Sequence, residues 1–148
     1  MQILRGLCPS KCRSDPARRL HYGLIGENGA GKTTTIKCIL NLIRRDAGRI
    51  TLLGQDNISG EKLAKADVGV VLDECYFHDT LRPLDIDRIL SRVFRTWDSG
   101  LFSDYLDKFQ LPEHKYVKEF SRGMKMKLSL AAALAHRPKL LILDEATA

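Results

Sequence analysis

The chain has 148 residues, of which 44% are hydrophobic and 28% are charged, and its formal net charge is +6. This length and balance predict one globular domain with a sizeable core and exclude an intrinsically disordered chain. No apolar run approaches the ~18 residues that are needed to cross a bilayer, which excludes a membrane-spanning chain.

Residues 1–19 show neither the period of a strand nor that of a helix, and we assign no element to them. They hold much of the positive charge, but no aromatic residues are interleaved with it, so we expect a solvated terminus and no nucleic-acid partner. Cys8 and Cys12 lack a second Cys pair or a close His pair to complete a zinc site. Reduced thiols in a cytosolic protein are the simpler interpretation.

A strand, a Gly-rich loop and a helix are predicted next. The segment Leu20–Gly26, LHYGLIG, has the length and apolar character of a buried strand. The loop that follows, GENGAGKTT at residues 26–34, matches the P-loop pattern G-x-x-x-x-G-K-[ST]. Apolar residues then recur at helical spacing, namely Ile36, Ile39, Leu40 and Ile43. Strand, loop and helix stand in the order that a P-loop requires.

A P-loop binds a nucleotide because successive backbone N–H groups point at the phosphate oxygens and a helix begins at the anion. In this sequence Lys32 would reach the β- and γ-phosphates, the Thr33 hydroxyl would ligate Mg²⁺, and Thr34 would lie near the α-phosphate. We therefore predict a bound nucleotide with Mg²⁺. The predicted nucleotide-binding residues of the loop are Gly26, Glu27, Asn28, Gly29, Ala30, Gly31, Lys32, Thr33 and Thr34.

Two short strands are predicted before the next long helix. The segment Asp46–Asp56, DAGRITLLGQD, indicates a strand between Gly48 and Gly54, and VGVVLDE at Val68–Glu74 indicates a short buried strand.

From Leu84 onward the pattern becomes helical. One apolar stripe consists of Ile86, Ile89, Leu90, Val93, Phe94 and Trp97, and the next of Leu101, Phe102, Tyr105, Leu106 and Phe109. A third helical stretch, Arg122–Ala135, carries Met124, Leu128, Ala131, Ala132 and Ala135 on its apolar face. We interpret the aromatic residues as core and not as a ligand-binding cluster.

The final predicted strand, KLLILDE at Lys139–Glu145, ends in two acids. In P-loop enzymes the strand beside the P-loop strand ends in an Asp that supports Mg²⁺, because this cation prefers oxygen ligands. Asp144 would take that role through water, and Glu145 would act as the catalytic general base. A buried strand that merely ends in solvated acids is the alternative, which the accompanying P-loop disfavours.

These motifs, with FSRGMKMKLSLAAALAHRPKLLILDE at Phe120–Glu145, resemble the nucleotide-binding subunit of an ABC transporter. The resemblance is greatest to the ATPases of the type-2 ABC exporter class in Gram-positive bacteria, and it runs from about Leu20 to Thr147. It implies an α/β P-loop NTPase fold of the ABC-ATPase type with a small helical subdomain. It also implies an ATP-hydrolysing subunit that powers export through a separate membrane subunit.

The family's LSGGQ loop corresponds to residues 120–124. Ser121 and Gly123 match it, whereas Arg122 and Met124 follow the S-[RK]-G-M form of the exporter class. In the family this loop faces the γ-phosphate of ATP held by a second subunit, so the resemblance implies a dimer in which Ser121 and Gly123 bind ATP. An amphipathic helix capped by Ser121 describes the same residues but does not explain the order and spacing of the motifs.

The family's Q-loop Gln falls on Asp73, which could reach Mg²⁺ or the attacking water but cannot donate a hydrogen bond when ionised. The resemblance further implies that an apolar groove of the helical subdomain receives a helix of the membrane-spanning subunit. It places the protein in the cytoplasm, peripheral on the inner face of the cell membrane.

The sequence departs from the family at both ends. The 25 residues before Gly26 show no strand pair for an adenine-stacking residue, and the family's D-loop and switch His would follow Glu145. We therefore expect a partial domain, truncated at the C-terminus and atypical at the N-terminus, with little ATPase activity alone. Its expected parts are the atypical residues 1–19, the P-loop core at 20–74, the helical subdomain at 75–121, and the helix and acidic strand at 122–148.

Two other functions stay open at this point, a soluble ABC-type ATPase acting on DNA or ribosomes and an inactive truncated fragment. In SMC-like DNA ATPases a long coiled coil separates the two nucleotide-binding halves. Here only 46 residues lie between Asp73 and Phe120, without sustained heptads, which favours the transporter.

Overall fold

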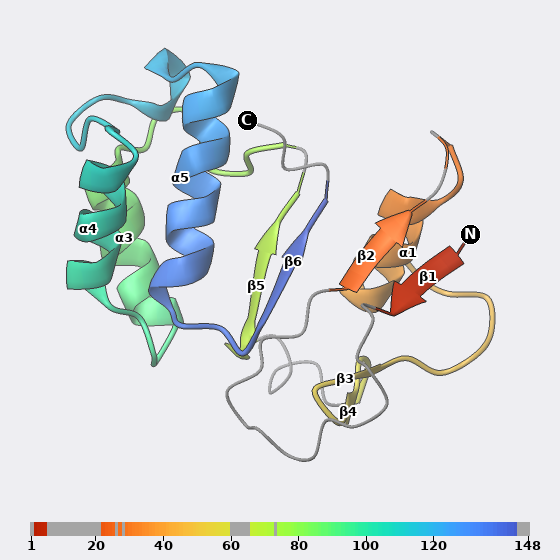
Figure 1. The fold of residues 1–148 in the computed structure, drawn as a ribbon. Coiled ribbons are helices and arrows are strands. Elements are labelled where there is room, and N and C mark those ends of the chain that lie inside the picture. The colour runs from red at the N-terminus through yellow and green to blue at the C-terminus, as the bar shows by residue number, and fades with distance from the viewer. Residues whose placement is uncertain are drawn as a thin grey trace, which may run out of the picture.

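The computed structural model describes residues 2–5, 22–25, 27, 29–59, 66–72 and 74–144. For residues 2–5 and 22–25 it describes the backbone only. The described residues form both helices and strands, as expected for an α/β protein (Figure 1). In order they are β1 (Gln2–Arg5), β2 (Tyr22–Ile25), α1 (Lys32–Ile39), β3 (Thr51–Leu52), β4 (Gln55–Asp56), β5 (Val68–Val71), α3 (Pro83–Val93), α4 (Ser99–Lys108), η1 (Val117–Glu119), α5 (Arg122–Ala135) and β6 (Leu140–Leu143).

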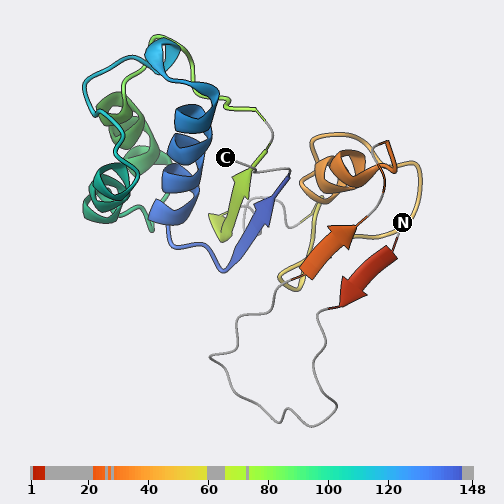
Figure 2. The same ribbon diagram turned by 45° about the horizontal axis from the view of Figure 1, so that its top comes forward.

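Strands β5 and β6 form a parallel pair that lies between α5 on one side and α1 on the other (Figures 1 and 2). Their side chains alternate between the two faces, as the pleat of a strand requires. On one face, Val68, Val70 and Leu72 join Ile36 and Leu40 of the α1 segment in a core cluster. On the other face, Val71 packs with Met126 and Ala133 of α5. The pair is therefore apolar on both sides, as the sequence predicted for buried strands.

The helices of the second half pack around one apolar cluster. Ile86 of α3, Phe102 and Leu106 of α4, and Leu128 of α5 are each at most 2% exposed. This arrangement confirms the three predicted helical stripes. Two members of the first stripe differ, because Ile89 and Val93 are 47% and 64% exposed.

The C-terminal end of α1 is held by a buried polar side chain, Asn57. Its amide nitrogen donates to the carbonyl oxygens of Cys38 and Ile39 at 2.8 and 3.0 Å, and its amide oxygen accepts from Arg45. Asn57 is 3% exposed, and these bonds satisfy both ends of its amide. It thereby caps α1 from the segment that follows β4.

Strand β1 corrects the expectation that residues 1–19 contain no element and no strand pair. Gln2–Arg5 pairs antiparallel with Tyr22–Ile25, with Gln2 opposite Ile25. Four residues are too few to display a period, and their partner strand lies far along the chain, so local pattern analysis misses them.

The predicted strand in Asp46–Asp56 is wrong in its form, because the chain turns back within it. Thr51–Leu52 and Gln55–Asp56 pair as a two-residue hairpin. Leu53 and Gly54 connect them with φ of 51° and 81°. Positive φ at both turn positions suits the twist of a tight hairpin.

The predicted apolar stripe of the first helix ends earlier than expected, since α1 stops at Ile39 and Ile43 is exposed.

The pairing of the acidic strand also differs from the prediction. We expected β6 beside the P-loop strand, but β6 pairs with β5 and β2 pairs with β1 across the described strands. The apolar face of the β5–β6 pair, with Leu140 and Ile142, packs on α1 instead.

We predict that Gly69→Ala destabilises the fold by about 1–3 kcal/mol, because the added methyl would overpack the contact between β5 and α5. A Cβ at Gly69 would lie 2.8 Å from the Ala133 carbonyl oxygen and 3.0 Å from Leu141 and Pro138. Urea unfolding measures the change. The matched control is Gly123→Ala, where no described atom beyond the adjoining residues and the backbone of α5 lies within 4 Å of the new Cβ. Equal stabilities of the two variants would contradict the close contact.

Candidate nucleotide-binding site

The Gly-rich loop before α1 has the backbone form of a phosphate-binding loop. Gly29 and Gly31 have φ of 85° and 87°, a region that residues with a Cβ rarely adopt. The Ala30 N–H donates to the Glu27 carbonyl at 3.0 Å and closes a tight turn. Gly31 is the N-cap residue of α1 and makes no side-chain cap. The loop therefore delivers the first turn of a helix to an exposed surface.

Lys32 begins α1, and its ammonium group donates to the Glu27 carbonyl across the loop at 3.1 Å. Thr33 and Thr34 follow in the same turn. The first N–H groups of a helix have no acceptor inside the helix, and the helix dipole favours an anion there. The structure thus brings together a cation, two hydroxyl groups and a helix N-terminus. Gly26 and Asn28 lie outside the described residues.

Asp144 immediately follows β6, and its backbone N–H donates to the Val71 carbonyl at 2.9 Å. The residue is 3% exposed, and its Oδ2 is buried without a hydrogen-bond partner in the described part of the chain. A buried carboxylate oxygen without a donor is costly unless a positive charge lies near it. This orphan oxygen therefore fits a role beside Mg²⁺, held directly or through water.

Strands β2, β5 and β6 point the same way (Figures 1 and 2), so the loop that leads from β2 to α1 and the residue that follows β6, Asp144, both come after the C-terminal end of a strand. Within the described ranges no three His, Cys, Asp or Glu side chains gather into a metal cluster. Mg²⁺ at a phosphate needs only one or two protein carboxylates, since phosphates and water supply its other ligands. The predicted base Glu145 and the Q-loop position Asp73 fall outside the residues that the structure describes.

The predicted second phosphate loop lies at the start of α5. Ser121 is the N-cap residue, and its hydroxyl accepts from the Met124 N–H at 3.2 Å. Gly123 lies in the first turn, and outside its own helix the described residues place no atom within 4 Å of a Cβ added there. The β5–β6 pair separates this helix start from α1 (Figure 1). Ser121 and Gly123 are therefore not brought to the P-loop of their own chain.

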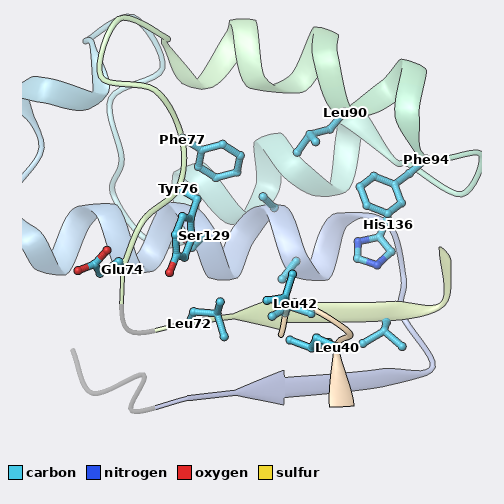
Figure 3. A pocket seen from close by; sticks show the side chains of 14 residues that line it. Leu40, Leu42, Leu72, Glu74, Tyr76, Phe77, Leu90, Phe94, Ser129 and His136 are labelled. Atoms are coloured by element: carbon cyan, nitrogen blue, oxygen red, sulfur yellow. The ribbon is translucent and has the colours of Figure 1, made fainter. Parts of the chain in front are cut away.

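A groove of about 400 Å³ opens along β5 between the α1 segment and the helical cluster (Figure 3). Its lining is mostly apolar and includes Leu42, Val70, Phe77, Leu90 and Phe94. At its rim Tyr76 is 67% exposed. The resemblance implied an apolar groove of the helical subdomain, but the walls of this groove come from four separate segments, which include β5 and the end of the α1 segment outside that subdomain.

His136 is a buried polar residue of the groove wall that sequence reasoning assigned no role. Its ring stacks on Phe94, with centroids 4.4 Å apart. Neither ring nitrogen forms a well-aligned hydrogen bond with the described residues. Burial lowers the pKa of His136, and the carbonyl groups of Ala132 and Val68 oppose that shift. The sequence offered one signal for a buried position, since the residue directly follows the apolar end of the third predicted helix.

A glycine-rich loop with Lys32 at a helix start, and a parallel strand ending in a buried Asp, define a P-loop nucleotide-binding protein. The family model described as "ABC transporter" matches residues 17–148. The chain therefore belongs to the ABC transporter family, which confirms the resemblance and the fold class.

The relatives are ATP-binding proteins of transporters. The bacitracin transport ATP-binding protein BcrA of Bacillus licheniformis is 35% identical over 128 residues, which cover 85% of this chain and 42% of that protein. The Nod factor export ATP-binding protein I of Burkholderia orbicola is 40% identical over 135 residues, covering 85% and 43%. The chain thus spans less than half the length of these relatives.

Solved structures agree on the fold. An ATP-binding subunit of an ABC transporter superposes with a TM-score of 0.74 at 27% identity, over 82% of this chain and 53% of that one. The ATP-binding cassette MJ0796, solved as a dimer with ADP and phosphate, gives 0.67 at 20% identity over 82% and 58%. None of the helices described here is long and apolar enough to span a membrane.

We predict that the free energy of unfolding falls as the pH drops below about 6.5, because the unfolded chain takes up a proton that buried His136 resists. This contribution is complete above the ordinary value of 6.5 and is lost as the pH falls toward the lowered pKa. His136→Leu should flatten the dependence between about pH 7 and 5 in urea unfolding. The control, His114→Gln at an exposed position, should keep it. An unchanged slope in His136→Leu would show that another group titrates.

Proposed function

We propose that the complete protein is the ATP-binding and ATP-hydrolysing subunit of an ABC transporter that powers export through a separate membrane subunit. The observation that carries this proposal is that the chain combines a helix start at Lys32 with an Asp144 oxygen that is buried without a hydrogen-bond partner among the described residues. Its similarity to export and resistance ATP-binding proteins supports the direction of transport.

In this proposal the backbone of residues 26–31 and the Lys32 ammonium group bind the phosphates of ATP. Thr33, Asp144 and Asp73 would hold Mg²⁺, which when bound would supply positive charge beside the phosphates. Glu145 accepts a proton from the attacking water. Glu145 directly follows Asp144 in the sequence.

We infer that the functional unit is a dimer. The start of α5 lies apart from the P-loop of the same chain, so Ser121 and Gly123 serve ATP only when it is held by a second subunit. The dimeric form of the ATP-binding cassette MJ0796 supports this arrangement for the fold. A monomer of residues 1–148 is accordingly expected to turn over little ATP.

The apolar groove supports a membrane partner. Leu42 and Tyr76 at its rim are 54% and 67% exposed, and large apolar surfaces of this kind mark interaction sites. An amphipathic helix of the membrane subunit fits such a groove. Docking there would hold the protein at the inner face of the cell membrane, in the cytoplasm.

A soluble ABC-type ATPase acting on DNA or ribosomes is a weaker alternative. The segment between residues 74 and 119 folds into α3, α4 and η1, which pack on α5 in one cluster. It therefore holds no long coiled coil, the element that separates the halves of SMC-like DNA ATPases.

We predict that Lys32→Ala lowers Mg-ATP affinity by roughly 10- to 100-fold, because it removes the charged hydrogen-bond donor placed among the phosphates. Calorimetry with Mg²⁺ measures the affinity. Lys37→Ala is the matched control, since Lys37 lies in the last turn of the same helix, away from the loop. Equal affinity in Lys32→Ala and the parent would refute the P-loop assignment.

We predict that Glu145→Gln in the complete protein retains ATP binding and slows turnover by about 10²- to 10⁴-fold, since it removes the base but leaves the Mg²⁺ site. Phosphate release under saturating ATP measures turnover. The control Asp104→Asn neutralises an exposed acid on α4 and should leave the rate unchanged. Parent-like turnover in Glu145→Gln would place the base elsewhere, with Asp73 the next candidate.

A further inference from the structure

The segment that leads from the groove into α3 runs beside the turn that precedes Ser121. The Val117 N–H donates to the Leu81 carbonyl at 2.9 Å, and the Lys118 N–H donates to the Asp79 carbonyl at 3.1 Å. Val117 is fully buried between them and the helical core. Residues 79–82 and 116–119 are thus joined along their backbones, although more than 30 positions separate them in the sequence.

Side chains reinforce this junction at its centre. The Arg82 guanidinium donates to the Tyr116 hydroxyl at 2.7 Å and lies 4.5 Å from the centre of the Tyr116 ring. A guanidinium that both stacks on a ring and donates to its hydroxyl is fixed in orientation, which an ammonium could not reproduce. The Tyr116 N–H donates to the Glu119 carboxylate at 2.8 Å and fixes the turn itself.

A third connection reaches α5 directly. The Lys125 ammonium lies 2.9 Å from the Asp79 carboxylate, and the hydrogen bond from Lys125 lowers the pKa of Asp79. An isolated exposed ion pair contributes little stability. This one links Asp79, whose carbonyl already accepts from the Lys118 N–H, to α5, which begins three residues after η1 ends, so the chain on both sides of the ion pair is already held close.

We propose that Arg82, Tyr116, Asp79 and Lys125 form a clamp that positions Ser121 and Gly123 against ATP held by the second subunit. The proposal rests on the dimeric function inferred above. Only Phe120, which is 6% exposed, stands between η1 and the Ser121 cap. The orientation of the turn therefore fixes where α5 begins, and the four clamp residues are positioning residues that act through Ser121.

The clamp predicts a separation of two measurable steps. Arg82 is the N-cap residue of α3, Tyr116 is that of η1 and Lys125 lies in α5, whereas the P-loop lies across the β5–β6 pair (Figure 1). Loss of the clamp should therefore leave ATP binding by each subunit intact. It should weaken ATP-dependent dimerisation and lower kcat, because positioning of groups from two chains is what fails.

The experiment uses the complete protein and the variants Arg82→Met and Tyr116→Leu. Calorimetry measures ATP affinity, sedimentation measures ATP-dependent dimerisation in a Glu145→Gln background, and phosphate release measures kcat. We expect the dimer dissociation constant to rise and kcat to fall by roughly tenfold or more, with ATP affinity changed by less than about twofold. Arg88→Met is the matched control and should behave as the parent. Arg88 lies in α3, the helix that begins directly after Arg82, and its side chain is 75% exposed.

Conservative and compensating variants separate positioning from misfolding. Tyr116→Phe keeps the ring under Arg82 and should give an intermediate effect. Asp79→Lys and Lys125→Asp should each weaken the dimer, and the double exchange should restore it. Loss of ATP affinity alongside dimerisation in every clamp variant would indicate general misfolding and overturn the positioning role.

The failure of the clamp and that of the dimeric function are distinguishable. If the parent does not dimerise with ATP in the Glu145→Gln background, the proposed dimeric function is wrong, and the clamp proposal falls with it. If the parent dimerises and Arg82→Met dimerises equally well, only the clamp proposal is overturned.

Discussion

Two four-residue strands hold the described structure together, because β5 and β6 are the only described elements with apolar side chains packed against both α1 and α5. Four residues from each strand pair in register, from Val68 opposite Leu140 to Val71 opposite Leu143. A shift by one residue would exchange the two faces and bring Gly69 to the side that packs on α1. The close approach of Gly69 to Ala133 favours a single register. That register sets where Asp144 leaves the sheet, so a packing constraint determines the position of a predicted metal-supporting group.

The motifs could be located from the sequence because each depends on local chemistry. Glycines at positive φ, a lysine at a helix start and an acid after an apolar strand are visible within a few residues of one another. The structure confirms these local forms at Gly31, Lys32 and Asp144. The features that were missed depend on distant partners. Strand β1 exists through its pairing with β2, and Asn57, a turn residue by its neighbours, caps a helix about 18 positions earlier. The hydrophobic pattern of β6 likewise does not indicate which other strand it pairs with, so its pairing with β5 could not be predicted.

One chain segment connects the two surfaces that the proposed transporter subunit would use. Tyr76 and Phe77 line the groove, and the residues that follow them enter the clamp that leads to Ser121. Between them the His78 carbonyl accepts from the Leu81 N–H, which makes this connection a short turn rather than a slack linker. A short, hydrogen-bonded segment therefore connects the groove to the residues that lead to Ser121, although the two surfaces would contact different partners.

The N-terminal ends of α1 and α5 differ in how their free backbone N–H groups are capped. Helix α1 begins at a glycine that offers no side-chain acceptor, whereas α5 begins at Ser121, whose hydroxyl already accepts from Met124. In the proposed nucleotide complex, a phosphate at α1 would supply the acceptor that Gly31 has no side chain to provide, and the bound nucleotide would stabilise the fold by mass action. A phosphate approaching α5 would instead share or displace the existing Ser121 cap. Under this proposal the first site would gain a cap from its ligand, whereas the second would exchange one acceptor for another.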